Sequence, residues 1–228
     1  MAGRALIFDL DGTLLDTEPI SGRAVQQVTS AFGKDYHFAL NKSVLGRPSA
    51  EWTRLVIDEL DLHGKIEPRD MALQWEANMK AMYDNLQEMP GALAFIRSMH
   101  ARGIPMAVAT SSSKAAVAVK RSHHEELFSY FQVIVCGDDD DVKRGKPAPD
   151  IFLTAARRLL GDDFDAAQCI VFEDSMLGVQ AGRAAGMKVM ALPDARYYPT
   201  TDEQEELFHA ADERLPSLSA FDPTKYGL

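Results

Sequence analysis

A series of short apolar runs, each ending at a polar or small residue, constrains the fold of this chain more than any other feature. The runs are Ala5–Phe8, Pro105–Ala109, Val133–Cys136, Cys169–Phe172 and Lys188–Leu192. Short runs rich in Val, Ile, Phe and Ala favour strands that are buried on both faces of a sheet. We therefore expect these segments to form the strands of one central sheet.

Helical patterns separate the apolar runs. The predicted helices are Ala92–Ala101, Lys114–Phe128, Pro149–Leu160 and Met176–Ala185. Gly103, Gly161 and Gly186 stand just beyond three of them, where a glycine commonly ends a helix because it adopts a left-handed backbone without strain. Alternating strands and helices are typical of a parallel sheet covered on both faces. The predicted fold class is therefore α/β, with a Rossmann-like parallel sheet.

Residues 17–87 depart from this alternation, because they contain helical patterns and no convincing core strand. The patterns cover Ser21–Phe32, Ala50–Leu60 and Arg69–Asn85. The side chains of Met71, Trp75, Met79 and Met82 recur at helical spacing, and such a stripe indicates packing in a core rather than a cofactor site. We predict an α/β core made of residues 1–16 and 88–228, into which residues 17–87 are inserted as a helical domain.

The charge balance argues against some classes of function. The 228 residues include 24 Lys and Arg against 34 Asp and Glu, a net charge of −10, whereas a nucleic-acid-binding surface needs a basic stripe. No apolar run approaches the ~18 residues of a membrane span, and the first residues show no signal-peptide pattern. The sequence thus predicts a cytoplasmic protein that binds neither nucleic acid nor membrane. Cys136 and Cys169 adjoin apolar runs and are expected to be buried, reduced thiols.

Candidate chemistry begins where the first apolar run ends, in the sequence FDLDGT of Phe8–Thr13. Two carboxylates, Asp9 and Asp11, placed two residues apart at the carboxyl end of a strand can converge on the crevice where open α/β sheets bind ligands. An Asp-Gly pair can also serve a plain turn. This segment alone leaves both interpretations open.

Three later strand ends carry complementary groups. Thr110 and Ser111 offer hydroxyls and backbone N–H groups beside a helix start, which suits phosphate, although serines there can simply cap the helix. Lys146 lies in a loop stiffened by two prolines, and Glu173 and Asp174 precede the next helix, where acidic residues are common. Together with Asp9 and Asp11, these groups could hold Mg²⁺ and a phosphate.

The four strand ends resemble the four motifs of the haloacid dehalogenase-like (HAD) phosphatases. The matching segments are Asp9–Thr13, Thr110–Ser111, Gly145–Pro147 and Phe172–Ser175, in the same order and at similar spacing over nearly the whole chain. The insertion at residues 17–87 is similar to the family's helical cap. A closer similarity, to the branch containing pseudouridine-5′-phosphatase and glycerol-3-phosphate phosphatases, rests on Gly137–Asp139, Gly145–Phe152, Lys120–His123 and Leu127–Ser129.

The resemblance implies a catalytic role for three of these residues. Asp9 would be the nucleophile that forms an aspartyl-phosphate. Asp11 would protonate the leaving alcohol and then take a proton from the hydrolytic water. Lys146 would bind phosphoryl oxygens together with Thr110 and the Ser111 backbone.

The same resemblance implies Mg²⁺ as the cofactor. Its ligands would be the side chains of Asp9 and Asp174 and the backbone carbonyl of Asp11, with Glu173 close by, either as a direct ligand or through water. Mg²⁺ and Lys146 would offset the repulsion between these carboxylates and a phosphate dianion.

Several other charged or ionisable residues give weaker indications of function. Arg47 lies where the cap of this family often contacts substrate, and it is interpreted either as such a contact or as a solvated charge. The run Asp138–Asp141 lacks the spacing of a calcium loop and is expected to be a solvated loop. His100, His123 and His124 lack matching ligands nearby in the sequence, so no metal is predicted there.

Three functions remain to be weighed. We predict a Mg²⁺-dependent phosphatase for a small phosphorylated metabolite, such as a nucleoside, polyol or sugar monophosphate, working as a monomer or weak homo-oligomer. A phosphomutase of the β-phosphoglucomutase type is an alternative, but Asp16–Ser21 lacks the cap histidine of that relative. A non-catalytic protein that binds a phosphorylated ligand is the third, and it would be expected to have lost motif residues.

Overall fold

The computed structural model describes residues 4–228, which divide into two compact units. The first contains the described residues up to Asp16 together with Gln87–Leu228, and the second contains Thr17–Leu86. Among the described residues, no helix combines the length and the apolar character needed to cross a membrane.

The first unit is built on a parallel sheet of six strands in the order β3-β2-β1-β4-β5-β6. The strands are β1 (Ala5–Phe8), β2 (Met106–Thr110), β3 (Val133–Cys136), β4 (Cys169–Glu173), β5 (Lys188–Ala191) and β6 (Glu213–Arg214). Phe8, the last residue of β1, pairs with Val108 on one side and with Phe172 on the other, so that β4 ends one residue further along and β2 ends two residues further along. This register brings the residues that follow the three strands to one edge of the sheet, and it confirms the predicted α/β class.

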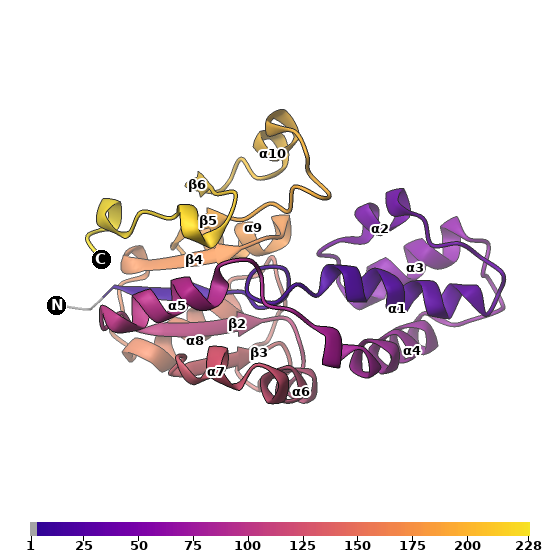
Figure 1. Ribbon diagram of the computed structural model, residues 1–228, viewed down its shortest axis with the longest axis horizontal. Coiled ribbons are helices and arrows are strands. Elements are labelled where there is room, and N and C mark those ends of the chain that lie inside the picture. Colours follow the sequence, from indigo (N-terminus) through magenta and orange to yellow (C-terminus); the bar gives the residue numbers. More distant parts are fainter. Residues whose placement is uncertain (1–3) are drawn as a thin grey trace. The chain divides into compact units, whose positions relative to one another are not determined.

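Helices cover both faces of this sheet (Figure 1). They are α5 (Ala92–Ala101), α6 (Lys114–His123), α7 (Glu125–Ser129), α8 (Asp150–Leu160) and α9 (Met176–Ala184). Helix α10 (Thr201–Leu207) instead projects away from the sheet (Figure 1). Helix α8 packs against β1, β2 and β3, and α9 packs against β4 and β5. Serine side chains cap the N-termini of two of the helices. Ser113 accepts a hydrogen bond from the Ala116 N–H in α6, and Ser175 accepts one from the Gly178 N–H in α9.

An aromatic cluster fills the sheet face that α5 covers. The rings of Phe8 and Phe172 stack with their centroids 4.8 Å apart, and Phe95 of α5 packs edge-on against both. Phe221, near the C-terminus, packs edge-on against Phe95 and Phe172. Fully buried aromatic rings contribute about 150–250 Å² of buried surface each, so this cluster anchors the residues that follow β1 and β4.

The second unit consists of helices α1 (Glu18–Ser30), α2 (Phe38–Val44), α3 (Ser49–Glu59) and α4 (Pro68–Ala81), followed by a 3₁₀ turn at Tyr83–Asn85. Prolines in the first turn of α1 and α4 have a backbone suited to starting a helix. Met71 is fully buried, and Trp75 packs against the same core, where its ring meets that of Trp52. Met79 is also buried, whereas Met82 is half-buried. The stripe therefore packs in the core over Met71, Trp75 and Met79, as its spacing predicts.

Several elements differ from the sequence prediction, which also lacked strand β6. The helix expected over Lys114–Phe128 is broken at His124, whose backbone is not helical (φ −132°, ψ 41°) and whose buried ring lies with Nδ1 3.5 Å from a Glu88 carboxylate oxygen. Helices α2 and α10 were not predicted. Helix α10 carried a usable signal, because Thr200 caps it by accepting from the Glu203 N–H, the Thr-x-x-Glu spacing of a capping box.

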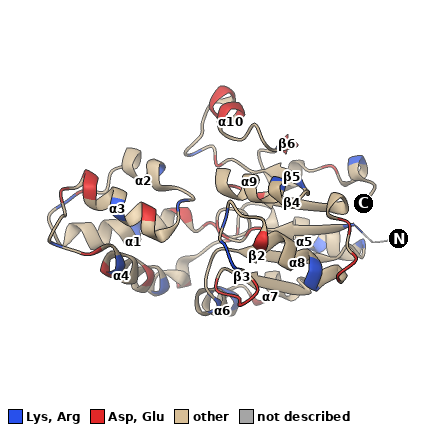
Figure 2. Cartoon of the chain, turned by 180° about the vertical axis from the view of Figure 1, so that it is seen from behind, with Lys and Arg blue, Asp and Glu red and all other residues tan. Residues whose placement is uncertain are grey.

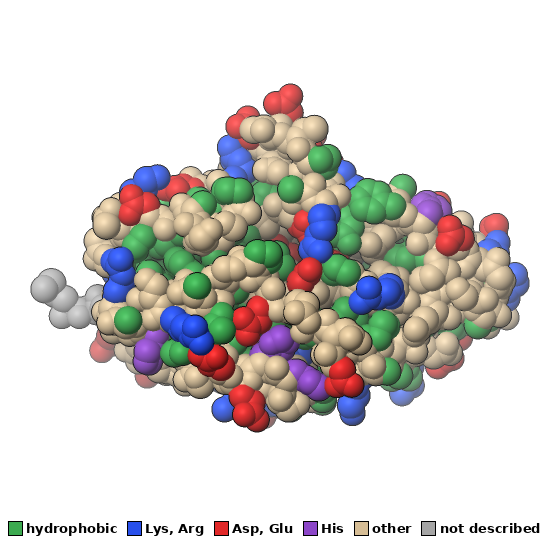
Figure 3. Space-filling model, viewed as in Figure 1, with side chains coloured by type: hydrophobic (Ala, Val, Ile, Leu, Met, Phe, Trp, Pro, Cys, Tyr) green, Lys and Arg blue, Asp and Glu red, His purple; other side chains and the backbone are tan. Residues whose placement is uncertain are grey.

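Acidic and basic residues are interspersed along most of the chain, with acidic residues concentrated on α10 (Figure 2). On the face shown in Figure 3, hydrophobic and charged side chains are likewise mixed. Cys136 and Cys169 are both buried and free, as expected, and burial raises the pKa of each thiol to about 11.

Candidate active site

The centre of the candidate site is a buried lysine between two carboxylates. Asp9 directly follows β1, and the Nζ of Lys146 lies 2.5 Å from its Oδ1. The same ammonium donates to Glu173 at the end of β4. All three side chains are at most 8% exposed, so three charged groups from three separate segments meet where little water reaches. Lys146 also lies over the ring of Phe152, 5.1 Å from its centroid, a stabilising contact for a cation.

The charges in this cluster do not balance. Burial raises the pKa of Asp9 to about 7; Lys146 opposes this shift, and the charges of Glu173 and Asp11 add to it. Burial also acts against the Lys146 ammonium, but attraction by Asp9 and Glu173 raises the pKa of that lysine above its usual value. One ammonium thus serves two carboxylates, and an additional cation would relieve the remaining repulsion.

Asp11 belongs to a second cluster, on the side of β1 that faces β2. Its Oδ1 accepts from the Nζ of Lys120 at 2.5 Å, and its Oδ2 accepts from the Oγ of Ser112 at 2.7 Å. Thr110, the last residue of β2, contacts the same Oδ2 at 3.4 Å, and its hydroxyl accepts from the Ser112 N–H at 3.0 Å. The two aspartates predicted at this strand end therefore reach different partners.

Asp174 lies against the turn that follows Asp11. Gly12 has φ +85°, and a Cβ there would come within 2.1 Å of the Asp174 Oδ2. Only a residue without a side chain suits both the backbone and the space. The Thr13 hydroxyl holds the other carboxylate oxygen at 3.3 Å. The Asp-Gly pair thus serves as a turn and also leaves room beside it for the acidic side chain of Asp174, the residue that follows β4.

Glu173 is more deeply buried and has more hydrogen bonds than the sequence indicates. Its side chain is 1% exposed, and besides contacting Lys146 it accepts from both the N–H and the hydroxyl of Ser175. A Cβ on Gly178 would overlap its carboxylate at 1.7 Å, so a glycine in α9 makes room for it. Glu173 is placed to hold Lys146, a role that its position in the sequence does not reveal.

The predicted donors suit a magnesium ion in kind. Carboxylate oxygens of Asp9 and Asp174 and a backbone carbonyl of Asp11 are hard ligands of the type that Mg²⁺ binds, and the uncompensated charge around Asp9 favours a cation. Residues 4–228 contain no group of three or more His, Cys, Asp or Glu side chains placed for one metal ion. The predicted set includes only two side chains, and it stays a prediction.

Two further predicted residues, Ser111 and Arg47, have other neighbours. Ser111 is exposed after β2, and its carbonyl would lie 2.5 Å from a Cβ on Gly137, so those two loops pass very close. Arg47 lies in the helical unit, where its Nε donates to the Ser43 carbonyl at 2.7 Å and its Nη1 lies 3.7 Å from Glu51. Its contact with substrate stays a prediction.

The acidic run Asp138–Asp141 is not simply solvated, which corrects the sequence interpretation. Asp139 is 8% exposed and pairs with Arg158 at 2.6 Å and Lys114 at 3.0 Å. Asp141 also pairs with Arg158. Because α8 supplies this arginine from far along the sequence, the pairing could not be inferred from the acidic run alone. Through these ion pairs, the loop after β3 is connected to helices α6 and α8.

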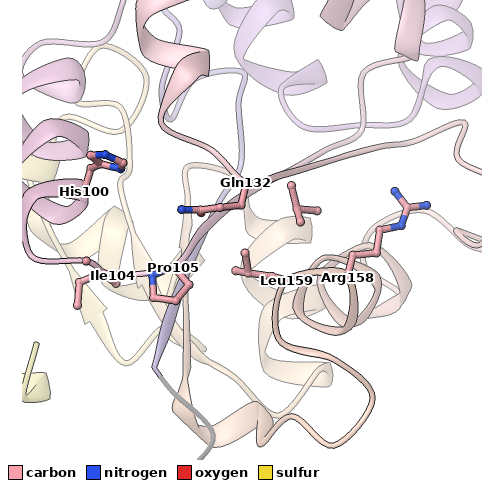
Figure 4. A pocket seen from close by; sticks show the side chains of 8 residues that line it. His100, Ile104, Pro105, Gln132, Arg158 and Leu159 are labelled. Atoms are coloured by element: carbon pink, nitrogen blue, oxygen red, sulfur yellow. The ribbon is translucent and has the colours of Figure 1, made fainter.

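A hollow of about 400 Å³ lies at the opposite edge of the sheet, where β2 and β3 begin. His100, Pro105, Gln132 and Arg158 are among its lining residues (Figure 4). Gln132 accepts from the Met106 N–H, and Arg158 is paired with the acidic run. Gln132 and Arg158 are therefore already hydrogen-bonded or ion-paired within the protein. The hollow lies away from the clusters around Asp9 and Asp11.

Comparisons with known proteins extend over both units. A family model described as haloacid dehalogenase-like hydrolase matches residues 4–186. The chain is 40% identical over 223 residues to a Drosophila melanogaster protein named "Probable pseudouridine-5′-phosphatase", with 97% of this chain and 93% of that protein covered. It is 36% identical over 223 residues to the mitochondrial (DL)-glycerol-3-phosphatase 1 of Arabidopsis thaliana, with 98% and 73% covered.

Some of the similar solved structures contain bound phosphate. A HAD family hydrolase from Deinococcus radiodurans, with bound phosphate and sodium, has a TM-score of 0.77 and 25% identity to this chain. The similarity covers 99% of this chain and 97% of that one. It therefore includes the sheet, the strand ends and the helical insertion.

Proposed function

Because the chain belongs to the haloacid dehalogenase-like hydrolase family and is a phosphatase of that family, we propose that it hydrolyses a small phosphomonoester through an aspartyl-phosphate on Asp9. The observation that carries this proposal is the buried Asp9 at the end of β1, with the Lys146 ammonium 2.5 Å from its carboxylate. A carboxylate becomes a useful nucleophile toward phosphate only where positive groups offset the charge of both reactants.

The reaction takes place in two displacements. A carboxylate oxygen of Asp9 attacks phosphorus and the P–O bond to the alcohol breaks, while Asp11 supplies the proton that the leaving alkoxide needs. Water then attacks phosphorus, the bond to Asp9 breaks, and Asp11 takes the proton from that water. Inorganic phosphate leaves and both aspartates return to their initial state.

Lys146, Thr110 and Ser111 hold the phosphoryl group in this proposal. Lys146 carries a full charge in a nearly dry pocket, where electrostatic stabilisation is stronger than in water. Thr110 ends β2 beside Asp11, and the loop from Ser111 leads into the N-terminus of α6. Backbone N–H groups at a helix start suit phosphate oxygens.

Asp9, Asp174 and the carbonyl of Asp11 would bind Mg²⁺. When bound, the ion neutralises charge on the transferring phosphoryl group and on Asp9. The raised pKa of Asp9 and the placement of Asp174 against Gly12 support this assignment. Activity should therefore require added Mg²⁺, and full activity in excess chelator would contradict the metal assignment.

The helical unit, residues 17–87 in the predicted division, is proposed to be the cap that selects substrates. A lid of this kind limits the size of what can react, which favours small metabolites. The names of the two relatives point to phosphate on a nucleoside or a polyol. Pseudouridine 5′-phosphate and glycerol 3-phosphate are therefore the first candidates, both of them esters of a primary alcohol.

A phosphate-release screen with Mg²⁺ tests the proposal. The panel should contain nucleoside, polyol and sugar monophosphates, with the Asp9→Asn variant as a matched control for contaminating phosphatases. Release of phosphate from a small ester by the natural chain alone supports the proposal. Transfer of phosphate to a second sugar hydroxyl without release would identify a phosphomutase, and binding without either reaction would identify a phospho-ligand-binding protein.

A further inference from the structure

Lys120 is a buried cation that the strand-end motifs do not include. It lies in the last turn of α6 and is 2% exposed, whereas the next residue, Arg121, is exposed. Lys120 shares a helix face with Val117, which is also buried. The helix therefore turns a charged side chain inward at a position whose spacing would suit an apolar one.

An ammonium this deeply buried needs a charged or hydrogen-bonding partner, because burying an unpaired charge is very costly. Lys120 finds both kinds of partner at the end of β1. Its Nζ lies 2.5 Å from the Asp11 Oδ1 and 2.9 Å from the Ser112 Oγ. The Lys120 side chain is 3% exposed and that of Asp11 is 27% exposed, so the lysine approaches from inside while the carboxylate keeps contact with solvent.

The contact with Ser112 also directs the serine proton. An ammonium has only protons to give, so Ser112 must act as acceptor toward Lys120. The hydroxyl proton of Ser112 is then directed to its other neighbour, the Asp11 Oδ2 at 2.7 Å. Both oxygens of the carboxylate are thereby held, one by the ammonium and one by the hydroxyl, and the plane and direction of the carboxylate are defined.

We propose that Lys120, together with Ser112, is a positioning residue that orients the Asp11 carboxylate for proton exchange with the leaving group. This inference rests on the proposed function, since it assigns Lys120 a part in the step that Asp11 performs. Lys120 contacts the acid, Asp11, and is not proposed to contact the phosphoryl group or the leaving alcohol. Its contribution is to hold a partly exposed acid in one orientation, because proton transfer depends on the donor oxygen lying within hydrogen-bond reach of the ester oxygen.

A positioning residue should share the leaving-group signature of the residue that it positions. An alkoxide leaving group needs a proton, whereas p-nitrophenolate hardly does. The quantity to compare is kcat/KM, which reports the steps up to cleavage of the ester P–O bond and excludes the later hydrolysis of the aspartyl-phosphate. Glycerol 3-phosphate and p-nitrophenyl phosphate are the two probes.

The test variant is Lys120→Met, which keeps the length of the side chain and removes its charge and donors. We expect kcat/KM to fall about 10- to 100-fold for glycerol 3-phosphate and less than about threefold for p-nitrophenyl phosphate, within the range of acid–base assistance. Lys120→Arg should restore part of the loss. Arg121→Met, an exposed cation one residue further along α6, should leave both values unchanged.

Combining the variant with Asp11→Asn separates positioning from a general structural effect. If Lys120 acts through Asp11, Lys120→Met should cause no further loss in the Asp11→Asn background, whereas independent effects would multiply. Circular dichroism and thermal unfolding check that each variant is folded. If Lys120→Met does not fold, Ser112→Ala removes the second hold on the same carboxylate and should give the same contrast between esters at smaller size.

The outcomes distinguish this inference from the proposed function. Equal loss on both esters, or multiplicative loss in the double variant, would overturn the role of Lys120 while the phosphatase mechanism stands. If the natural chain with Mg²⁺ hydrolyses neither probe nor any ester of the screen, the proposed function fails and the role of Lys120 fails with it. A selective loss on glycerol 3-phosphate that vanishes in the double variant supports the inference.

Discussion

Two lysine–aspartate pairs flank the end of β1, and they differ in what surrounds them. Lys146 and Asp9 are equally buried, each with a side chain 8% exposed, whereas Lys120 is 3% and Asp11 27% exposed. Lys146 is shared with a second carboxylate, and Lys120 is shared with a hydroxyl. The two pairs combine the same residue types and have the same 2.5 Å separation, yet they present different chemistry.

The difference teaches how one strand end can serve two roles. Around Asp9 two carboxylates face one ammonium, a charge excess that suits a cation and a phosphoryl group brought in together. Around Asp11 an ammonium and a hydroxyl each hold one carboxylate oxygen, and the greater exposure of this carboxylate suits exchange of protons with substrate and water. In the proposed mechanism, burial and neighbouring groups, rather than residue type, distinguish the nucleophile from the acid.

The largest effect is expected when the buried pair is broken at its carboxylate. Asp9→Asn removes the proposed nucleophile and one proposed metal ligand, so turnover of every ester should fall by at least ~10⁴-fold, as when other enzymes lose their nucleophile. The variant should remain folded, because it relieves like-charge repulsion. Phosphate release and circular dichroism measure the two effects. Turnover above about one per cent of the natural rate would point to a different nucleophile.

Breaking the more exposed pair should give a loss that depends on the substrate. Asp11→Asn should slow ester cleavage by ~10²–10⁴-fold for an alkyl phosphate and much less for p-nitrophenyl phosphate, which needs no acid. With the latter, a burst of p-nitrophenol should precede slow turnover, because the second step lacks its base. Acid-quenched mass spectrometry should find phosphate on the peptide containing Asp9. Equal slowing without burst or adduct would mean that Asp11 only positions the metal.

Replacing Lys146 makes the sharpest contrast with Lys120, because the same change is made in each pair. Lys146→Met should lower kcat/KM by ~30- to 1000-fold, equivalent to about 2–4 kcal/mol of lost electrostatic stabilisation. The loss should be similar for both esters, since every substrate carries the same phosphoryl group. A loss confined to alkyl esters would assign Lys146 to the acid, and a change below about threefold would make it a bystander.

The smallest effect is expected outside both pairs. Arg47 is 46% exposed on the helical unit, and a contact of that kind contributes little, so Arg47→Ala should raise KM by about two- to fivefold. The ratio between the two esters and the apparent affinity for Mg²⁺ should not change. Michaelis–Menten kinetics over a series of Mg²⁺ concentrations measures all three. Identical kinetics in the variant and the natural chain would leave Arg47 as a solvated charge.

Much of the architecture follows from local pattern. The apolar runs at Ala5–Phe8 and Val133–Cys136 are strands with the predicted bounds, and Ala92–Ala101 is a helix with the predicted bounds. Runs buried on both faces carry their own signal, because every residue must be apolar. The four strand ends also pointed to one edge of the sheet, since parallel strands bring their carboxyl ends together.

The sequence by itself determined the fold class, the strand-end residues and the family they resemble. Only the tertiary structure decided that Lys120 and Ser112 contact Asp11, that Glu173 holds Lys146, and that Gly178 leaves room for the Glu173 carboxylate. Each of these depends on side chains from separate elements meeting in a space that burial closes. Spacing along the chain reports which face a residue occupies, but it does not report what stands opposite. A buried lysine in α6 therefore looks like any surface lysine until the sheet beside it supplies the carboxylate.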